Sequence, residues 1–433
     1  MIRAYPLHPG VSPGAILTLC VSSATARFRV EFLRQGATLA PCGEARFSDG
    51  RRAPDGSPDA DWDWPRHSFA VPVGWRSGAY LARLHCDGAD AAVPPGECLF
   101  VVRGDPARPA AIVYKLALFT WHAYNETSPG ASLYTGGRRL TLRRPGGGAG
   151  GTPWDADVPD VYDRSSPRQV FAHWDAPFIA WLERAGHAVD YCTDLDVHAE
   201  PALLAPYRLL LSVGHDEYWS EPLRAQVERF VAGGGNVAFF GANTCWWRVH
   251  VDAQGTAFSC DRDPVDAANE AGPAVDMWHA TRTEASLTGC SYRHGGGWWD
   301  GTRPALGFTV RESAHWVFAG TGLARGDEFG AQARLVGYEC DGCALEGAGL
   351  DARVRHDEGT PTGFEVLALA WLGPGWQDLK ADGPAAATLG LYTRGGTVFN
   401  AATVDWARVL ASGVEPVVER ITRNVLERLG GDR

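Results

Sequence analysis

Hydrophobic runs in the first hundred residues are short and are separated by turn residues. Runs of β-forming residues alternate with Gly, Pro and Asp, and no segment of useful length has helical periodicity. This spacing is typical of a small antiparallel sandwich. The runs cover residues 15–20, 26–32, 67–73, 78–84 and 98–102. We therefore expect an all-β domain of immunoglobulin-like type over residues 1–105, followed by a linker, Gly104-Asp105-Pro106-Ala107-Arg108-Pro109.

The pattern changes after residue 107, where strand-like and helical segments alternate. Apolar runs predict strands at residues 111–120, 188–192, 209–213 and 237–240. Helices are predicted after Asp175 and Ser220, each with a proline in its first turn, and from about Val414 to Leu429. Alternation of this kind predicts a parallel sheet covered by helices on both faces. Residues 107–433 are thus expected to form an α/β domain, with a large insertion over about 245–385.

The end of the third of these strands carries an unusual group of side chains. Leu209 to Val213 are uncharged, Gly214 follows, and His215, Asp216, Glu217 and Tyr218 then come together. Ligands of open α/β sheets bind just past the carboxyl ends of strands. The alternative is that these residues only cap the next helix, but Ser220 already supplies a cap. We interpret the block as part of a functional site.

The next strand leads into a sharp turn. Gly241 allows the backbone to bend, which puts Asn243 at the apex of a strand-to-helix or strand-to-loop elbow. An amide cannot attack a carbonyl carbon, but it can donate to a developing oxyanion or orient water. Cys245 lies two residues further on, so a cysteine nucleophile at the apex is not expected.

Aromatic and acidic side chains elsewhere are weaker candidates for the same cleft. Tyr124 belongs to a polar and aromatic cluster, 120–126, placed at the end of the first strand of the α/β domain, and Tyr134 follows nearby. A tyrosine near a strand end more often serves packing. Glu339, in Gly337-Tyr338-Glu339, and Asn400 are further residues for the cleft wall.

Composition and charge exclude several classes of partner. The formal net charge is −11, from 51 acidic and 40 basic residues, and there is no basic run, so nucleic acid is not an expected partner. No apolar run approaches the roughly 18 residues that span a bilayer, and the N-terminus lacks a signal-peptide core. We expect a soluble cytoplasmic protein without a membrane partner, whose ten cysteines are free thiols. The 17 tryptophans fit either an aromatic cleft or a large core.

Four blocks together resemble a known family. They are Thr120-Trp121-His122-Ala123-Tyr124-Asn125, Gly214-His215-Asp216-Glu217-Tyr218-Trp219, residues 234–243, and Gly396-Thr397-Val398-Phe399-Asn400-Ala401. This series resembles the C-terminal domain of the N,N-dimethylformamidase large subunit over about residues 107–433. The resemblance implies a parallel-sheet fold like that of glutamine amidotransferases, flavodoxin-like in outline and related to trehalose-utilisation proteins.

The resemblance also implies a cofactor and an activity. It implies a mononuclear non-haem iron, Fe(III), held by two tyrosines and one glutamate, with a histidine and an asparagine beside it. Glu217 matches the glutamate, while Tyr124 and Tyr134 match the tyrosines, with Tyr162 as a competitor. His215 and Asn243 match the histidine and the asparagine, and we expect Glu339 as a third catalytic residue. Phenolate and carboxylate oxygens suit Fe(III) as a Lewis acid.

We therefore expect a hydrolase of a linear amide bond in a small molecule. The small subunit of the family's enzyme is not encoded in this chain, and a homo-oligomer remains open. The alternative function is a carbohydrate-binding or sugar-modifying protein of the trehalose-utilisation-like type without amidase activity, which the aromatic-rich insertion would suit.

Overall fold

The computed structural model describes residues 1–431 except 89, 91, 129, 159, 163, 165, 263–275 and 380–382. By its internal contacts the chain divides into two compact units. The first comprises Met1–Ala110, Leu116–Glu200 and Val249–Cys260, and the second comprises Ala111–Lys115, Pro201–Arg248 and Asp261–Arg433. The domain boundary predicted at residues 105–107 lies inside the first unit and stays a prediction.

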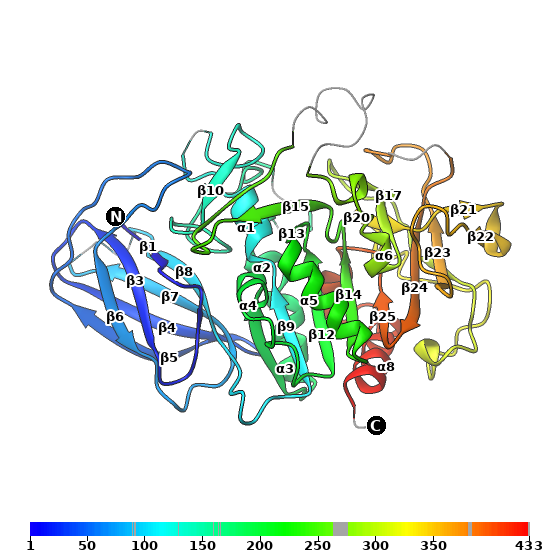
Figure 1. Ribbon diagram of the computed structural model, residues 1–433, viewed down its shortest axis with the longest axis horizontal. Helices are drawn as coiled ribbons and strands as arrows, with labels where there is room; N and C mark the ends of the chain where they lie inside the picture. Colours follow the sequence, from blue (N-terminus) through cyan, green and yellow to red (C-terminus); the bar gives the residue numbers. More distant parts are fainter. Residues whose placement is uncertain are drawn as a thin grey trace. The chain divides into compact units, whose positions relative to one another are not determined.

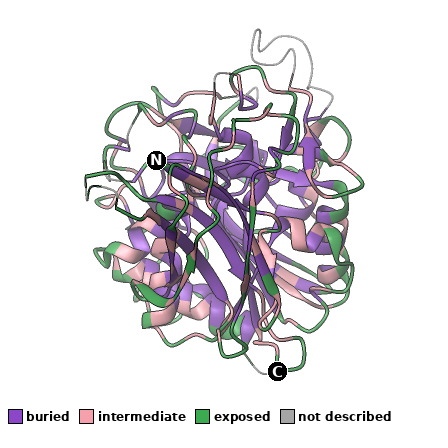
Figure 2. Cartoon of the chain, turned by 90° about the vertical axis from the view of Figure 1, so that its left-hand side faces the viewer, coloured by how far each residue is buried: buried purple, intermediate pink, exposed green. Residues whose placement is uncertain are grey.

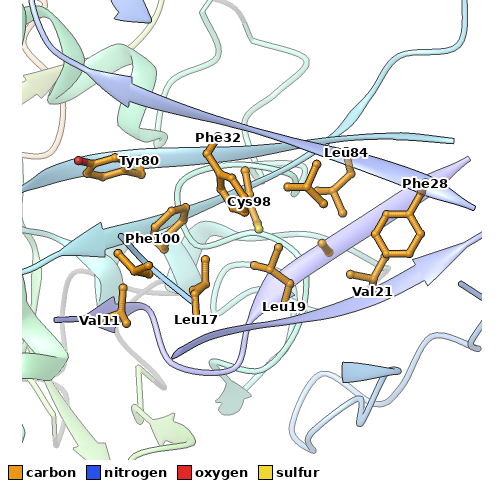
Figure 3. Close-up of a cluster of buried hydrophobic side chains, with 14 of the residues drawn as sticks. Val11, Leu17, Leu19, Val21, Phe28, Phe32, Tyr80, Leu84, Cys98 and Phe100 are labelled. Atoms are coloured by element: carbon orange, nitrogen blue, oxygen red, sulfur yellow. The ribbon is translucent and has the colours of Figure 1, made fainter. Parts of the chain in front are cut away.

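The N-terminal part of the first unit consists of two sheets that share one core. One sheet has the order β1-β3-β6 and the other β2-β8-β7-β4-β5. Alternate side chains of each strand point inward, and they meet in a cluster that includes Leu19, Phe32 and Phe100 (Figure 3). The strands are β1 (Ile2–Pro6), β2 (Gly10–Val11), β3 (Ile16–Ser23), β4 (Phe28–Gln35), β5 (Leu39–Phe47), β6 (Arg66–Ala70), β7 (Gly78–Cys86) and β8 (Gly96–Val102).

The rest of the first unit is made of short helices and strands. The predicted strand over 111–120 is wrong in its second half, because β9 (Ile112–Leu116) ends early and α1 (Leu118–Tyr124) follows. Every residue of β9 and of α1 is buried, so no alternation of buried and exposed positions divides the run into strand and helix. The other elements are β10 (Arg139–Thr141), α2 (Phe171–Trp174), α3 (Ala176–Arg184), β11 (Val189–Thr193), α4 (Asp194–Ala199), β15 (Trp247–Val251) and β16 (Ala257–Ser259).

A large mixed sheet forms the centre of the second unit, in the order β9-β12-β14-β25-β24-β23-β18-β19 (Figure 1). Its first part is parallel, because β12 pairs in parallel with β9 and β14, and β14 pairs in parallel with β25. Its second part is antiparallel. The strands are β12 (Leu209–His215), β14 (Asn236–Ala242), β18 (Phe308–Val310), β19 (Glu328–Phe329), β23 (Glu365–Trp371), β24 (Ala386–Arg394) and β25 (Gly396–Asn400).

The prediction of a parallel sheet with a large insertion is therefore met by only part of the sheet. Strands β18, β19 and β23 come from the segment predicted to be the insertion, and they extend the sheet antiparallel. Strands β18 and β19 have only three and two residues, which is too few for their periodicity to be recognised along the sequence. Strand β23 has seven residues, but its neighbour β18 in the sheet comes from a distant part of the chain. The same segment also contains β17 (Ser291–Trp298) and β20 (Tyr338–Gly342), which pair with each other, while β21 (Leu345–Glu346) pairs with β22 (Arg353–Val354).

Helices cover the parallel part of this sheet. After the short strand β13 (Tyr218–Ser220), Ser220 caps α5 (Glu221–Ala232) by accepting a hydrogen bond from the Leu223 backbone, as predicted. Helix α5 packs against β14 and β25, and α8 (Pro416–Gly430) packs against β12 and β14. The remaining helices are α6 (Ala285–Thr288) and α7 (Trp406–Ser412). Figure 2 shows that buried residues follow the strands, whereas exposed residues lie in loops and on outer helix faces.

Strands β12 and β14 approach each other closely at their carboxyl ends. Gly214 pairs with Gly241 in the parallel register, and Gly214 has a φ of +70°. A Cβ atom on Gly241 would overlap the carbonyl oxygen of Gly214. Backbone atoms cannot move aside as a flexible side chain can, so this approach requires glycine. The polar segments that begin at His215 and at Asn243 come just after these two glycines.

We predict that Gly241→Ala lowers the free energy of unfolding by about 1–3 kcal/mol, because the added methyl group pushes β12 and β14 apart. Chemical denaturation of the purified protein measures this change. The matched control is Gly373→Ala, since no atom lies within 4 Å of the Cβ position at Gly373. A loss of stability no larger for Gly241→Ala than for Gly373→Ala would show that the strands are not constrained there.

Candidate functional site

The side chains that follow β12 point in two directions. His215, Asp216 and Glu217 are all at least 97% buried. Asp216 points toward β9, where its Oδ2 lies 2.7 Å from the Lys115 ammonium and accepts a 2.5 Å hydrogen bond from the Ser212 hydroxyl. His215 and Glu217 lie on the other side and contact each other. The buried ion pair therefore separates Asp216 from the two residues with candidate chemistry.

His215 lies between two carboxylates. Its Nε2 is 2.9 Å from Glu339 Oε2 and 3.5 Å from Glu217 Oε2. Glu339 comes from β20, far from His215 in the sequence, and it is almost fully buried. A buried imidazole in contact with a buried carboxylate can hold or transfer a proton without loss to bulk water. The structure thus brings together His215, Glu217 and Glu339, as the predicted site requires.

Asn243 joins the same cluster from the elbow after β14. Its φ is +49°, and that of Cys245 is +58°, so the backbone turns through the left-handed region as the predicted elbow requires. The side-chain nitrogen Nδ2 lies 3.2 Å from Glu339 Oε2 and 3.5 Å from His215 Nε2. Among the described residues, none hydrogen-bonds the buried Oδ1 of Asn243. Because an ionised carboxylate only accepts hydrogen bonds, the nitrogen must face Glu339 and the oxygen is left free.

Glu339 is surrounded by donors. Its Oε1 accepts a hydrogen bond from the indole nitrogen of Trp299 at 3.2 Å. Burial opposes ionisation of Glu339, but the charge and hydrogen bond of His215, with the hydrogen bonds of Asn243 and Trp299, outweigh it and hold the pKa of Glu339 below its usual value. Glu339 is therefore ionised at neutral pH and is suited to act as a base.

Three residues of this cluster were missed by the sequence reasoning. Asp341 accepts the backbone N–H of Asn243 at 2.7 Å, Trp299 holds Glu339, and Lys115 holds Asp216. The alternation of Glu339 and Asp341 along one strand was a signal for Asp341, because residues two apart in a strand face the same side. Trp299 belongs to the pair Trp298-Trp299, which hinted at an aromatic cleft, but its contact with Glu339 had no signal. Lys115 had no signal at all, since its partner lies far away in the sequence.

Cys245 is not placed as a nucleophile. It is fully buried, and burial raises the pKa of its thiol, which disfavours the reactive thiolate. Its backbone N–H donates to the Asp216 carbonyl at 2.9 Å. The prediction that the elbow lacks a cysteine nucleophile agrees with this geometry.

The tyrosines predicted as metal ligands belong to the first unit. Tyr124 is the last residue of α1 and is 95% buried, and its ring stacks on that of Tyr134 at a centroid distance of 4.2 Å. Tyr134 in turn stacks on Trp154 at 5.1 Å. Tyr162 is half-buried, and its backbone N–H donates to Asp160. Because Glu217 belongs to the second unit, the choice between these tyrosines stays a prediction.

The donor types of the predicted set suit iron. Two neighbouring phenols and a buried carboxylate are hard oxygen donors, as Fe(III) prefers. Within the described ranges, no group of three or more His, Cys, Asp and Glu side chains is arranged to hold a metal ion. A set of two tyrosines and one glutamate contains only one residue of those types, so the predicted set is not affected by this observation.

Tryptophans that lie outside the regular strand and helix patterns of the sequence mostly fill the interior. Trp62, Trp64, Trp246 and Trp247 are all buried, which matches the core interpretation rather than an open aromatic cleft. Asn400, another candidate for the cleft wall, donates to the Thr288 carbonyl and accepts from the Ala402 backbone. These contacts give Asn400 a role in holding the chain after β25.

We predict that Asp341 makes the protein less stable as the pH rises. Burial raises the pKa of Asp341 from its ordinary 3.8 to about 8, so between these values the folded state binds a proton that the unfolded state has lost. Stability must fall with pH over that window. Asp341→Asn removes this titration, so its free energy of unfolding should fall less steeply than that of the wild type when urea denaturation is compared at about pH 5.5 and about pH 8. The exposed Glu365→Gln is the control, and identical slopes for wild type and Asp341→Asn would contradict the prediction.

No helix in the described parts of the chain is both long and apolar enough to cross a bilayer.

Comparison with known proteins agrees with the family expected from the four sequence blocks. No curated protein matches the sequence significantly. A family model described as N,N-dimethylformamidase beta subunit-like, C-terminal, matches residues 36–419 and so covers most of the chain, including every residue of the cluster around His215. The chain therefore belongs to the N,N-dimethylformamidase beta subunit-like, C-terminal family.

Proposed function

We propose that the cluster of His215, Glu217, Asn243 and Glu339 hydrolyses a linear amide bond of a small molecule. The family points to an amidohydrolase of the dimethylformamidase type. The observation that carries the proposal is the position of His215, whose Nε2 lies between the carboxylates of Glu339 and Glu217. In the reaction, water adds to the amide carbonyl carbon, the carbon–nitrogen bond breaks, and a carboxylic acid and an amine leave.

Proton transfer is assigned to Glu339 and His215. Glu339 is ionised at neutral pH and is 2.9 Å from His215 Nε2, so the pair can take the proton that water loses when it attacks. The same proton must later reach the amine nitrogen, because an unprotonated amide nitrogen is a poor leaving group. Burial of both side chains keeps that proton within the site.

Asn243 is assigned to the orientation of water. Its nitrogen is engaged by Glu339, whereas its buried oxygen has no hydrogen-bond partner among the described residues. A buried amide oxygen without a partner is costly, and a water molecule that donates to it removes the cost. Of the two roles expected from the sequence, orientation of water thus fits better than donation to an oxyanion.

The cofactor proposed for this reaction is a mononuclear iron, Fe(III). Glu217 would hold it together with two of the tyrosines, for which Tyr124 and Tyr134 are proposed and Tyr162 competes. When bound, the iron supplies a Lewis acid that polarises the amide carbonyl or lowers the pKa of water. His215 contacts Glu217 at 3.5 Å and so can orient this carboxylate.

The finer description of the fold belongs to the same proposal. We propose that the second unit has the arrangement of glutamine amidotransferases, in which strands β9, β12, β14 and β25 run parallel and polar groups follow their carboxyl ends. The elbow after β14 supports this, because it occupies the place of the nucleophile turn and carries Asn243 in the left-handed region.

We predict that Glu339→Gln lowers kcat for amide hydrolysis by about 10²–10⁴-fold, because the base is lost while the shape is kept. The effect is measured with the purified chain alone, as release of ammonia from formamide and acetamide and of dimethylamine from N,N-dimethylformamide. Asn243→Gly should also lower kcat, by about 10²-fold, without straining the elbow, since glycine adopts positive φ freely. The exposed Glu365→Gln is the control. Unchanged kcat in Glu339→Gln would exclude its role as base.

We predict about one iron per chain in the purified protein, lost in Glu217→Ala. Elemental mass spectrometry of wild type, Glu217→Ala, Tyr124→Phe, Tyr134→Phe and Tyr162→Phe identifies the ligands, because only loss of a ligand lowers the iron content. Asn243→Gly should keep its iron and serves as the control. Metal-free protein that binds no added Fe(III) would overturn the cofactor, and sugar binding retained by the variants would favour the carbohydrate alternative.

A further inference from the structure

Residues with left-handed backbone gather around strand β20. Among the described residues other than glycine, eight have positive φ, and four of these lie at the elbow or beside β20: Asn243 (+49°), Cys245 (+58°), Tyr338 (+47°), which precedes Glu339, and Ala402 (+59°). Such conformations are unfavourable for residues with a Cβ atom and persist only where surrounding contacts enforce them. Because several of these residues lie beside the candidate base Glu339, contacts in this region must enforce the turn at Asn243.

Asp341 is the group that contacts this turn. Its Oδ1 accepts the backbone N–H of Asn243 at 2.7 Å, and its Oδ2 lies 3.5 Å from the backbone nitrogen of Thr244. The side chain is buried, so no water can replace it as acceptor without rearrangement. The backbone of Asp341 is itself held, because its N–H donates to the Ala402 carbonyl at 3.1 Å.

Strand β20 therefore holds Asn243 at two points. Glu339 binds the side-chain nitrogen of Asn243, and Asp341 binds its backbone nitrogen. Both carboxyl groups lie on the same side of the strand because the two residues are two positions apart. The segment 402–404 holds this strand through two backbone hydrogen bonds, because the Val404 N–H donates to the Glu339 carbonyl at 3.1 Å, next to the bond between Asp341 and Ala402. One strand thus sets both the base and the residue beside it.

We propose that Asp341 is a positioning residue that holds the left-handed turn at Asn243 and thereby keeps the Asn243 amide against Glu339 and His215. This inference rests on the proposed amidohydrolase site. Of the groups assigned to the chemistry, Asp341 hydrogen-bonds Asn243, and it acts through this residue. Loss of its carboxyl group leaves a buried backbone N–H without an acceptor, so the turn relaxes and the Asn243 side chain moves away from Glu339.

To hold the turn, Asp341 needs an oxygen that accepts a hydrogen bond, and it does not need a negative charge. Glu284 and Glu339 face Asp341, and burial together with these acids favours its protonated form. A protonated carboxyl group still accepts the Asn243 N–H through its carbonyl oxygen. Asparagine has the same shape and the same acceptor, so Asp341→Asn should keep the turn, whereas Asp341→Ala should lose it.

Hydrogen exchange measures the turn without any substrate. In the full-length protein, Asp341→Ala should lower the protection of the Asn243 amide by about tenfold, because one buried hydrogen bond is lost, while Asp341→Asn retains it. Glu284→Gln is the matched control, since Glu284 is also a fully buried acid but accepts from Ser291 instead. Wild-type protection in Asp341→Ala, or an equal loss in Glu284→Gln, would overturn the proposal.

A double-mutant cycle separates positioning from general stability. Glycine adopts positive φ without strain, so Asp341→Ala should destabilise the protein less in the Asn243→Gly background than in the wild type. Equal destabilisation in both backgrounds would show that Asp341 does not act on the turn. If Asp341→Ala does not fold, the same comparison with Asp341→Ser decides the question, because the shorter serine hydroxyl does not reach the Asn243 backbone.

Kinetics tests the link to catalysis. Asp341→Ala should lower kcat for formamide by about 10–100-fold with little change in KM, because a displaced residue misplaces the reacting water, and Asp341→Asn should restore most of it. Unchanged kcat would overturn the positioning role. A wild-type chain that hydrolyses no amide would instead overturn the proposed function, whereas hydrogen exchange and the double-mutant cycle would still decide whether Asp341 holds the turn.

Discussion

The buried ion pair between Lys115 and Asp216 determines which way the side chains after β12 face. Both side chains are almost inaccessible to solvent, and the Lys115 ammonium also lies 4.9 Å from the ring of Trp219. Removing one partner of such a pair leaves an unpaired buried charge, which typically costs about 3–5 kcal/mol. The Asp216 side chain therefore points toward β9, and the side chains of His215 and Glu217 point to the opposite side, where they contact each other.

The backbone of the same block organises the elbow. The Asp216 carbonyl accepts the Cys245 N–H, and the Glu217 carbonyl accepts the Trp247 N–H, both at 2.9 Å. The segment after β14 is thus fastened to the segment after β12, in addition to the close approach of Gly214 and Gly241. Strand β20 completes the arrangement from a third direction. The cluster depends on three separate segments whose contacts are made by buried polar groups, and such contacts are rigid because each has few alternatives.

Several features could be predicted from the sequence because their causes are local. The strand from Leu209 and the helix after Ser220 follow from apolar patterning and capping, and the elbow at Asn243 follows from the glycine before it. His215 and Glu217 were predicted as site residues because polar residues that follow an apolar parallel strand lie at a sheet edge where ligands bind. The resemblance of four blocks to the family added the expectation of iron, and the family itself is confirmed by the match over residues 36–419.

The sequence by itself therefore determined the local strands and helices, and the types of residue that follow the end of each strand. Only the tertiary structure decided that α1 replaces the end of a strand, that β18, β19 and β23 join the sheet antiparallel, and that Asp341 and Trp299 hold the candidate site. The physical reason is the same in each case. Local patterning depends on neighbours along the chain, whereas the pairing of a short strand, or of a buried acid with a distant backbone N–H, depends on which segments meet in space.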